Sequence, residues 1–260
     1  MKYSGDFETA TWKKDETWVW AWCTVEIGNI ENITYGNSIE TFFEWIQNQK
    51  NPEIYFHNLK FDGSFILDYL LNNGYEYIEN RKDRKPKTFT CLISDLNQFY
   101  QIEVFFEVGN KTVKKVTFYD SLKIIPMPVR DIPKAFKLEE SKLEIDYNKE
   151  RPKGHELTQE EKDYITNDVV IVARALDLFF SQKLTKMTIG SNALAYFKLL
   201  IGFFRFKHYF PQLDPQVDQD LRKAYKRWLY LFKSNISGKR SRKRSCFRRK
   251  FFISFSYARS

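Results

Sequence analysis

Runs with the alternating pattern of β-strands succeed one another through positions 2–119, and two stretches of helical spacing interrupt them. A turn rich in Lys and Asp separates the first two runs, which indicates an opening hairpin. Strands that come first, with helices interspersed, predict an α/β or α+β domain. The expected strands are Lys2–Phe7, Trp18–Val25, Glu53–Phe56, Thr88–Ser94, Gln101–Val108 and Lys114–Tyr119.

Four segments combine helical spacing with residues that favour helix ends. The expected helices run from Ser38 to Asn51, from Asp62 to Leu71, from a capping box of Thr158 and Glu161 to about Phe180, and from Ser191 to about Phe204. The last helix is expected to begin a second unit. In the second strand, Trp18, Trp20 and Trp22 alternate with other residues, so we expect the three rings on one face of the sheet.

Hydrophobic residues make up 43% of the 260 positions, which is enough for one substantial core and excludes a wholly disordered chain. Cys23, Cys91 and Cys246 are far apart and only three histidines occur, so we expect neither a disulfide framework nor a structural zinc site. No apolar run is long enough to span a membrane, and the N-terminus is acidic where an export signal is apolar. We therefore expect a cytoplasmic protein.

The net charge of +9 is confined to one segment of the chain. Lys226–Ser260 contains 12 of the 42 basic residues and none of the 33 acidic ones, so positions 1–225 carry a small excess of acid. An inference of nucleic-acid binding from the whole-chain charge would therefore concern this tail alone.

Carboxylates with regular spacing stand on three predicted elements. Asp6 and Glu8 lie two residues apart on the first strand and should share a face. Asp62 follows His57 and Asn58 at a strand-to-helix junction, where it could equally be an ordinary N-cap. Asp168 lies one turn after Tyr164 on the long helix, a spacing that also occurs on plain helix surfaces.

Taken together and in this order, the three patterns favour a two-metal site. Four carboxylates that converge from distant segments can hold two hard divalent cations, Mg²⁺ or Mn²⁺, which activate water for phosphodiester hydrolysis. The residues concerned are Asp6, Glu8, Asp62 and Asp168.

Five ordered blocks of the sequence resemble the N-terminal part of protein-primed family B DNA polymerases of small tailed phages. The resemblance covers residue 1 to about residue 225. It implies an α/β fold of the ribonuclease H-like (DnaQ-like) 3′→5′ exonuclease class, with a mixed sheet and flanking helices. The blocks are Ser4–Thr9, Tyr55–Gly63, Tyr119–Lys123, Ile145–Pro152 and Tyr164–Asp168.

The resemblance also implies roles for individual residues. Asp6, Glu8, Asp62 and Asp168 would bind the two cations. Tyr164 would orient the attacking water, and Lys142 would assist at the scissile phosphate. The residues that would hold a single-stranded 3′ end are Thr9, Asn58, Phe61, Ser121 and Leu122, with His57 behind them. For His57, packing inside the protein and contact with DNA remain equally open.

Further implications concern the whole chain. Residues 1–188 would form the exonuclease domain, 189–225 the start of the polymerase palm, and 226–260 a basic, disordered tail. The partners would be a single-stranded DNA 3′ end and, in an intact enzyme of this kind, a terminal protein. We expect a monomer, free of membranes, in the cytoplasm of the phage host.

The resemblance stops after Tyr225, where the family continues with Lys or Arg followed by Gly-Gly-Phe. The segment Lys226–Leu229 can be encoded so that a reading frame shifted by one base gives Lys-Gly-Gly-Phe. Treated in the same way, Cys246–Phe255 gives Val-Phe-Asp-Val-Asn-Ser-Leu-Tyr-Pro, the first palm motif of the family. We therefore interpret residues 227–260 as an out-of-frame translation.

The leading hypothesis is a truncated phage DNA polymerase that keeps the metal-dependent exonuclease and lacks the polymerase active site. One alternative is a non-catalytic remnant that binds single-stranded DNA. Another is that no stable protein accumulates, because the incomplete palm segment exposes surface meant for missing parts.

The nucleotide sequence around the codon for Tyr225 tests the interpretation of the tail. We expect a run of A at the codons for Lys226 and Arg227, and a palm-coding sequence downstream in another frame. An uninterrupted frame for the tail, with no palm sequence in any frame, would contradict it.

Overall fold

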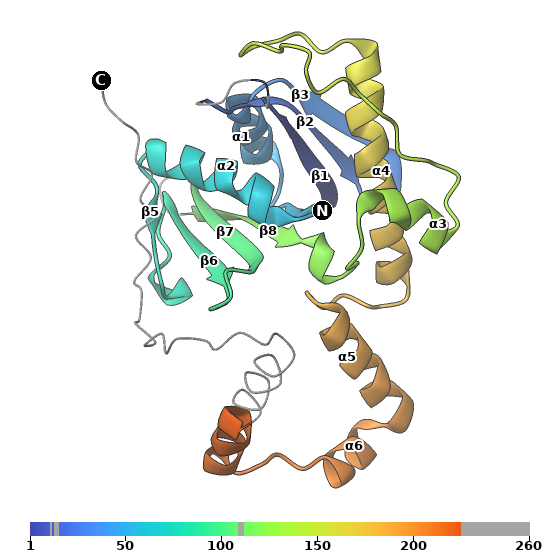
Figure 1. Ribbon diagram of the computed structural model, residues 1–260. Coiled ribbons are helices and arrows are strands. Elements are labelled where there is room, and N and C mark those ends of the chain that lie inside the picture. The colour runs from blue at the N-terminus through green and yellow to red at the C-terminus, as the bar shows by residue number, and fades with distance from the viewer. Residues whose placement is uncertain (11, 13–15, 109–111, 225–260) are drawn as a thin grey trace, which may run out of the picture. The chain divides into compact units, whose positions relative to one another are not determined.

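The computed structural model describes residues 1–10, 12, 16–108 and 112–224 (Figure 1). The tail from residue 225 onward, including the part interpreted as out of frame, lies outside the described residues. The strands are β1 (Lys2–Thr9), β2 (Val19–Glu26), β3 (Asn29–Gly36), β4 (Glu53–Phe56), β5 (Glu76–Tyr77), β6 (Thr88–Ile93), β7 (Phe99–Val108) and β8 (Thr112–Asp120). The helices are α1 (Ile39–Asn48), α2 (Leu59–Asn72), α3 (Ile132–Phe136), α4 (Gln159–Ser181), α5 (Ile189–Ile201) and α6 (Phe203–Tyr209).

All eight strands form one mixed sheet in the order β3-β2-β1-β4-β8-β7-β6-β5. The three central strands β1, β4 and β8 are parallel, whereas β1–β2, β2–β3, β6–β7 and β7–β8 pair antiparallel. The six predicted strands and the opening hairpin are confirmed, with small differences at their ends. The sequence did not predict β3 and β5.

Helices cover both faces of the sheet (Figure 1). On one face, α1 and α2 bury an aromatic core in which Phe7, Phe42 and Phe56 pack edge to face at ring-centroid distances of 4.8–6.1 Å. On the other face, α4 packs on β1 and β2. The long helix thus lies against the strand that carries Asp6 and Glu8.

Two helix starts agree with their predicted caps. The Thr41 N–H donates to Ser38 Oγ at 3.3 Å, and α4 opens with the expected reciprocal bonds between Thr158 and Glu161. The start of α2 differs, because Asn58, at a φ of 81°, precedes it and the helix begins at Leu59. Asp62 therefore lies within the first turn, and the alternative that made it the N-cap is wrong.

The expected single face for three tryptophans is also wrong. The pairing of β1 with β2 slips between Glu8 and Thr9, so that Trp20 is an extra residue in β2. As a result, Trp20 packs in the core under α4, as does Ala21, whereas Trp22 packs in the core under α1.

The last predicted helix is interrupted. Residues 189–201 form α5, Gly202 adopts a φ of 82°, and α6 follows. The chain divides into two compact units, Met1–Leu200 and Ile201 onward. The domain boundary at residue 188 and the palm assignment of 189–225 stay predictions. None of the helices in the described residues is long and apolar enough to cross a membrane.

Candidate active site

Three parallel strands end at the same edge of the sheet. β1 ends with the segment Asp6–Thr9, β4 leads into His57 and Asn58, and β8 leads into the 3-10 turn Ser121–Lys123 (η2). The loops beyond the carboxyl ends of such strands are where ligands bind in open α/β sheets. Predicted site residues from all three segments therefore share one edge.

Asp6 and Glu8 lie on the face of the sheet that α4 covers. Their Cα partners on β2 are Cys23 and Ala21. Directly opposed residues of an antiparallel pair share a face, and Cys23 and Ala21 belong to the core cluster that contains Tyr164 of α4. The prediction that both carboxylates share a face is confirmed.

Burial raises the pKa values of the four predicted carboxyl groups, and for Asp6, Glu8 and Asp62 the charge of a neighbouring carboxylate raises them further. Burial, followed by the charge of Asp168, raises the pKa of Asp6 to about 7. Burial and the charges of Asp6 and Asp168 raise the pKa of Glu8 to about 8. The pKa of Asp62 is well above its usual value because of burial, Asp6 and Glu8, and burial also raises the pKa of Asp168. The charge of one carboxylate shifts the pKa of another in this way only at short range, so the four side chains lie close together.

The donor chemistry of this cluster fits divalent cations. Asp62 Oδ1 and Asp168 Oδ1 are buried and have no hydrogen-bond partner among the residues that the structure describes. A buried carboxylate oxygen without a partner is costly, and a hard cation would satisfy it. Within the described residues, however, no three or more His, Cys, Asp or Glu side chains are arranged so that they could hold a metal ion.

Lys142 supplies a positive charge beside these carboxylates. Its Nζ donates to Asp168 Oδ2 at 2.8 Å. Burial opposes the charged ammonium, but the bond and the charge of Asp168 raise the pKa of Lys142. The predicted lysine therefore does lie beside the predicted carboxylates, and it stays protonated there.

Tyr164 faces the same cluster from α4. Its pKa is raised by burial first, then by its hydrogen bond with the Tyr147 hydroxyl and by the charges of Glu8 and Asp168. The hydroxyl thus remains protonated and can donate a hydrogen bond. Tyr147 stands in one of the blocks quoted above, but nothing in the sequence indicated that it contacts Tyr164.

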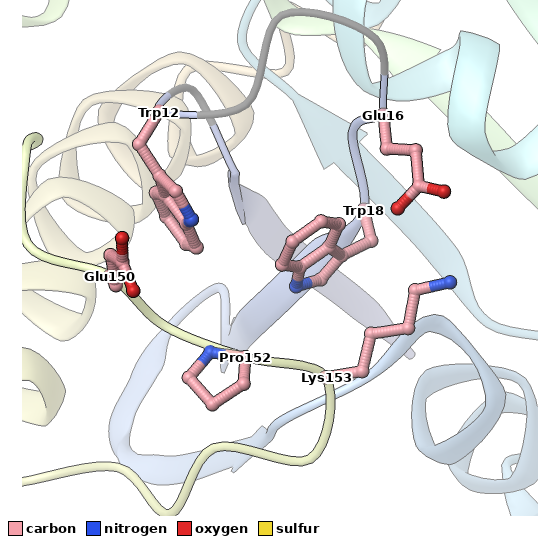
Figure 2. A pocket seen from close by; sticks show the side chains of 6 residues that line it. All are labelled: Trp12, Glu16, Trp18, Glu150, Pro152 and Lys153. Carbon is pink, nitrogen blue, oxygen red and sulfur yellow. The ribbon is translucent and has the colours of Figure 1, made fainter.

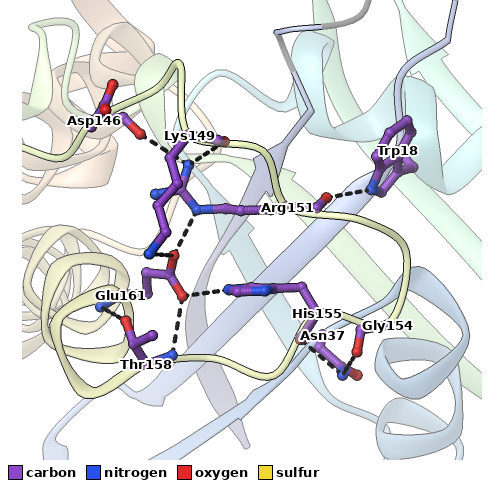
Figure 3. A network of polar contacts seen from close by, with 9 residues as sticks. All are labelled: Trp18, Asn37, Asp146, Lys149, Arg151, Gly154, His155, Thr158 and Glu161. Atoms are coloured by element: carbon purple, nitrogen blue, oxygen red, sulfur yellow. Dashed lines mark hydrogen bonds and ion pairs between the residues drawn. The ribbon is translucent and has the colours of Figure 1, made fainter.

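A buried ion pair ties the irregular segment before α4 to the start of that helix (Figure 3). Arg151 Nε donates to Glu161 Oε1 at 2.7 Å, and both side chains are about 2% exposed or less. Burial alone would raise the pKa of Glu161, but Arg151 and His155 lower it to about 2. The capping-box glutamate therefore also anchors the preceding loop to α4.

Further bonds to Arg151 complete this anchor. Its Nη1 donates to the backbone oxygens of Asp146 and Lys149 at 2.9 and 3.1 Å, and its guanidinium lies 4.4 Å from the Trp20 ring centroid. A buried charge is tolerated when its donors are used in this way. The extra residue in β2 supplies the aromatic face.

Asp120 joins the other two strand ends. Its Oδ1 accepts from the backbone N–H groups of Asn58, Leu59 and Leu122 at 3.0–3.3 Å, and the side chain is buried. Asp120, which lies at the end of β8, thus accepts the hydrogen bonds at the start of α2 that an N-cap side chain would otherwise accept. Asp120 lies in one of the five resembling blocks, Tyr119–Lys123, but no role was predicted for it.

Two predicted DNA-binding residues have their polar atoms engaged inside the protein. Ser121 Oγ donates to the Phe56 carbonyl at 3.0 Å and lies 3.0 Å from His57 Nδ1. His57 Nε2 lies 2.8 Å from the Met127 carbonyl. This geometry fits the packing interpretation of His57, and DNA contact by either residue stays a prediction.

Other predicted DNA-binding residues are more accessible. Phe61 is 50% exposed and lies edge-on to Phe65, with ring centroids 5.7 Å apart. Asn58 is exposed and Leu122 is half-buried, whereas Thr9 at the end of β1 is buried. The sheet edge therefore presents an aromatic face and an amide beside the carboxylates.

Comparisons with known proteins identify the family of the chain. The profile of the family described as DNA polymerase type B, organellar and viral, matches residues 45–226. The chain belongs to this family. The match includes Asp62, Lys142, Tyr164 and Asp168, and it ends where the basic tail begins.

Curated relatives include DNA polymerases of Bacillus phages and of a Streptococcus phage. The chain is 43% identical to the enzyme of Bacillus phage Nf and 42% identical to that of Bacillus phage phi29, over 224 residues in each case. It is 32% identical to the enzyme of Streptococcus phage Cp-1 over 237 residues. The matches cover 85–86% of this chain but only 38% of each relative's length.

Solved structures of phi29 DNA polymerase resemble the fold at 40% identity. The complex with single-stranded DNA matches with a TM-score of 0.77, and an orthorhombic crystal form with 0.78. Each match covers 85% of this chain and 38% of that structure. The expected α/β fold of the ribonuclease H-like exonuclease class, and the predicted phage polymerase relationship, are confirmed.

Replacing one crowded carboxylate should stabilise the metal-free protein. The folded-state pKa of Asp6 lies above its usual value, so its favourable contribution at low pH is lost as pH rises through about 7. At pH 8 in a chelating buffer, we expect Asp6→Asn to raise the melting temperature. Each 1 kcal/mol gained in the free energy of unfolding should raise it by about 2–4 °C. Added Mg²⁺ should stabilise the wild type more than the variant.

Asp68→Asn serves as the control, since Asp68 is an exposed carboxylate on α2. It should leave the melting temperature and its Mg²⁺ response unchanged. A lower melting temperature for Asp6→Asn than for the wild type at pH 8 would contradict the claim that the charge of Asp6 destabilises the metal-free protein.

Proposed function

We propose that this chain folds the 3′→5′ exonuclease part of a protein-primed phage DNA polymerase and removes nucleotides from single-stranded 3′ ends. The observation that carries the proposal is the proximity of Asp6, Glu8, Asp62 and Asp168, since the charges of Asp6, Glu8 and Asp168 raise the pKa values of neighbouring carboxyl groups in this set. The family membership and the likeness to a polymerase complexed with single-stranded DNA support it. We further propose that the protein acts in the host cytoplasm.

In this proposal, Asp6, Glu8, Asp62 and Asp168 hold two divalent cations, Mg²⁺ or Mn²⁺. When bound, the cations supply charge stabilisation at the scissile phosphate and lower the pKa of water. The unpartnered oxygens of Asp62 and Asp168 support this assignment.

The remaining polar groups orient the reactants. The protonated Tyr164 hydroxyl holds the attacking water, and its contact with Tyr147 limits its rotation. Lys142, fixed by Asp168, places a positive charge beside the scissile phosphate.

The DNA end lies at the same strand edge. Phe61 offers a face on which a base stacks, and Asn58 donates to sugar or phosphate oxygens. Thr9 and Leu122 line the same edge, while Ser121 and His57 keep the two loops together through their mutual contact.

Exonuclease activity tests the proposal. We expect the purified chain to release deoxynucleoside monophosphates from 5′-labelled single-stranded DNA in Mg²⁺. The double variant Asp6→Ala with Glu8→Ala should lose this activity by at least about 100-fold, because it loses half of the anionic site. Release is followed by gel electrophoresis and chromatography of the products.

A double variant of exposed acids, Glu44→Ala with Asp68→Ala, is the matched control and should retain activity. Equal product release by the wild type and the Asp6/Glu8 variant would refute the nuclease. DNA binding without any metal-dependent release from the wild type would favour the non-catalytic alternative.

A further inference from the structure

A recess of about 410 Å³ is lined by residues that take no part in the proposed exonuclease site (Figure 2). In Figure 2, the indoles of Trp12 and Trp18 stand over the segment 150–153. Their ring centroids are 5.5 Å apart and their planes are nearly perpendicular, at 89°. The lining residues are Trp12, Glu16, Trp18, Glu150, Pro152 and Lys153.

Hydrogen bonds hold the walls of this recess in place. The Ala10 N–H donates to the Trp18 carbonyl at 2.9 Å, and Thr17 Oγ1 donates to the Ala10 carbonyl at 2.9 Å. These bonds join Ala10, just after β1, to Thr17 and Trp18, just before β2. The Trp18 Nε1–H donates to the Arg151 carbonyl at 3.2 Å, which ties the second indole to the anchored loop.

The recess adjoins the carboxylate cluster. Both tryptophans pack against the hydrophobic cluster that contains Tyr164. From Glu8 to Trp12 the chain advances four residues, which spans at most about 14 Å at an extended rise of 3.4 Å per residue. The charge of Arg151 also acts on Glu8, so the loop beneath the recess lies close to the same carboxylate.

The chemistry of the lining suits an unpaired nucleobase. Indole faces are sequence-tolerant platforms for stacking, and both tryptophans are only half-buried. Glu16 and Glu150 disfavour a phosphate inside the recess, whereas Lys153, with its Nζ 5.8 Å from the Trp18 ring centroid, offers a charge for a phosphate at the rim. An apolar peptide side chain would use the indoles but not this lysine.

We propose that Trp12 and Trp18 form a stacking subsite for a base of the same single strand, on the 5′ side of the nucleotides held at the exonuclease site. The inference rests on the proposed function, because the position of this base is defined by the 3′ end of the strand bound at the exonuclease site. The subsite would hold the strand while successive terminal nucleotides are removed.

Binding of short and long oligonucleotides to the full-length chain tests the subsite. Affinities for a trinucleotide and a decanucleotide of thymidine are measured by fluorescence anisotropy in a chelating buffer, where hydrolysis does not interfere. Stacking on an aromatic side chain contributes about 1–3 kcal/mol per base, or about 5- to 150-fold in affinity. We expect Trp12→Ala to reduce the preference for the decanucleotide about 5-fold or more, and Trp12→Phe to retain most of it.

Tyr77→Ala removes an exposed aromatic from β5, at the end of the sheet order, and should leave the preference unchanged. Melting temperatures establish that each variant is folded. A preference unaltered by Trp12→Ala, or an equal loss of affinity for both lengths, would overturn the subsite. Failure of the nuclease proposal is distinguishable, since it appears as absent product release in Mg²⁺ while the length preference can still be measured.

Discussion

The parallel pairing of β1 with β4 and of β4 with β8 is the constraint on which the site depends. It brings three strand ends from distant parts of the chain to one edge of the sheet. Helix α4, folded against β1 and β2, then adds Asp168 and Tyr164 from the covered face, and the first turn of α2 adds Asp62. Burial at this meeting point makes the carboxylates repel one another, which is tolerable only if protons or cations neutralise them.

Two buried acids outside the cluster hold its surroundings in place. Asp120 accepts three backbone N–H groups and so joins the start of α2 to the end of β8. Glu161 pairs with Arg151 and ties the irregular segment before α4 to the start of that helix (Figure 3). Both acids are satisfied by hydrogen bonds, whereas Asp62 and Asp168 each keep one buried oxygen, Oδ1, without a hydrogen-bond partner among the described residues. Asp120 and Glu161 thus stabilise the fold through hydrogen bonds, whereas Asp62 and Asp168 keep a buried oxygen that a cation could satisfy.

The local sequence pattern was sufficient to predict most strands and helices and to select the four candidate carboxylates. Alternation identified six strands, and the Thr158–Glu161 capping box located the start of α4. β3 was missed because its side chains are mostly exposed or half-buried, so it lacks an apolar alternation. The first turn of α2 was missed because its cap is supplied by Asp120, about sixty residues later, and local sequence does not report such a partner.

Sequence spacing placed Asp6 and Glu8 on one face, but it did not reveal the supporting contacts. The extra residue at Trp20 moves one indole beneath α4, where it meets Arg151, and no alternation rule anticipates that shift. Likewise, the contact between Tyr147 and Tyr164 depends on a loop without regular structure. Such contacts depend on long-range packing. The periodicity of hydrophobic residues predicts the helices and strands but not how these pack against one another.

Anomalous diffraction from crystals soaked in Mn²⁺ tests the central claim most directly, because it locates cations without reference to activity. The account predicts two manganese peaks about 3.5–4 Å apart, in contact with carboxylate oxygens of Asp6, Glu8, Asp62 and Asp168. Manganese bound elsewhere, with these four side chains left without a cation at saturating concentration, would contradict it.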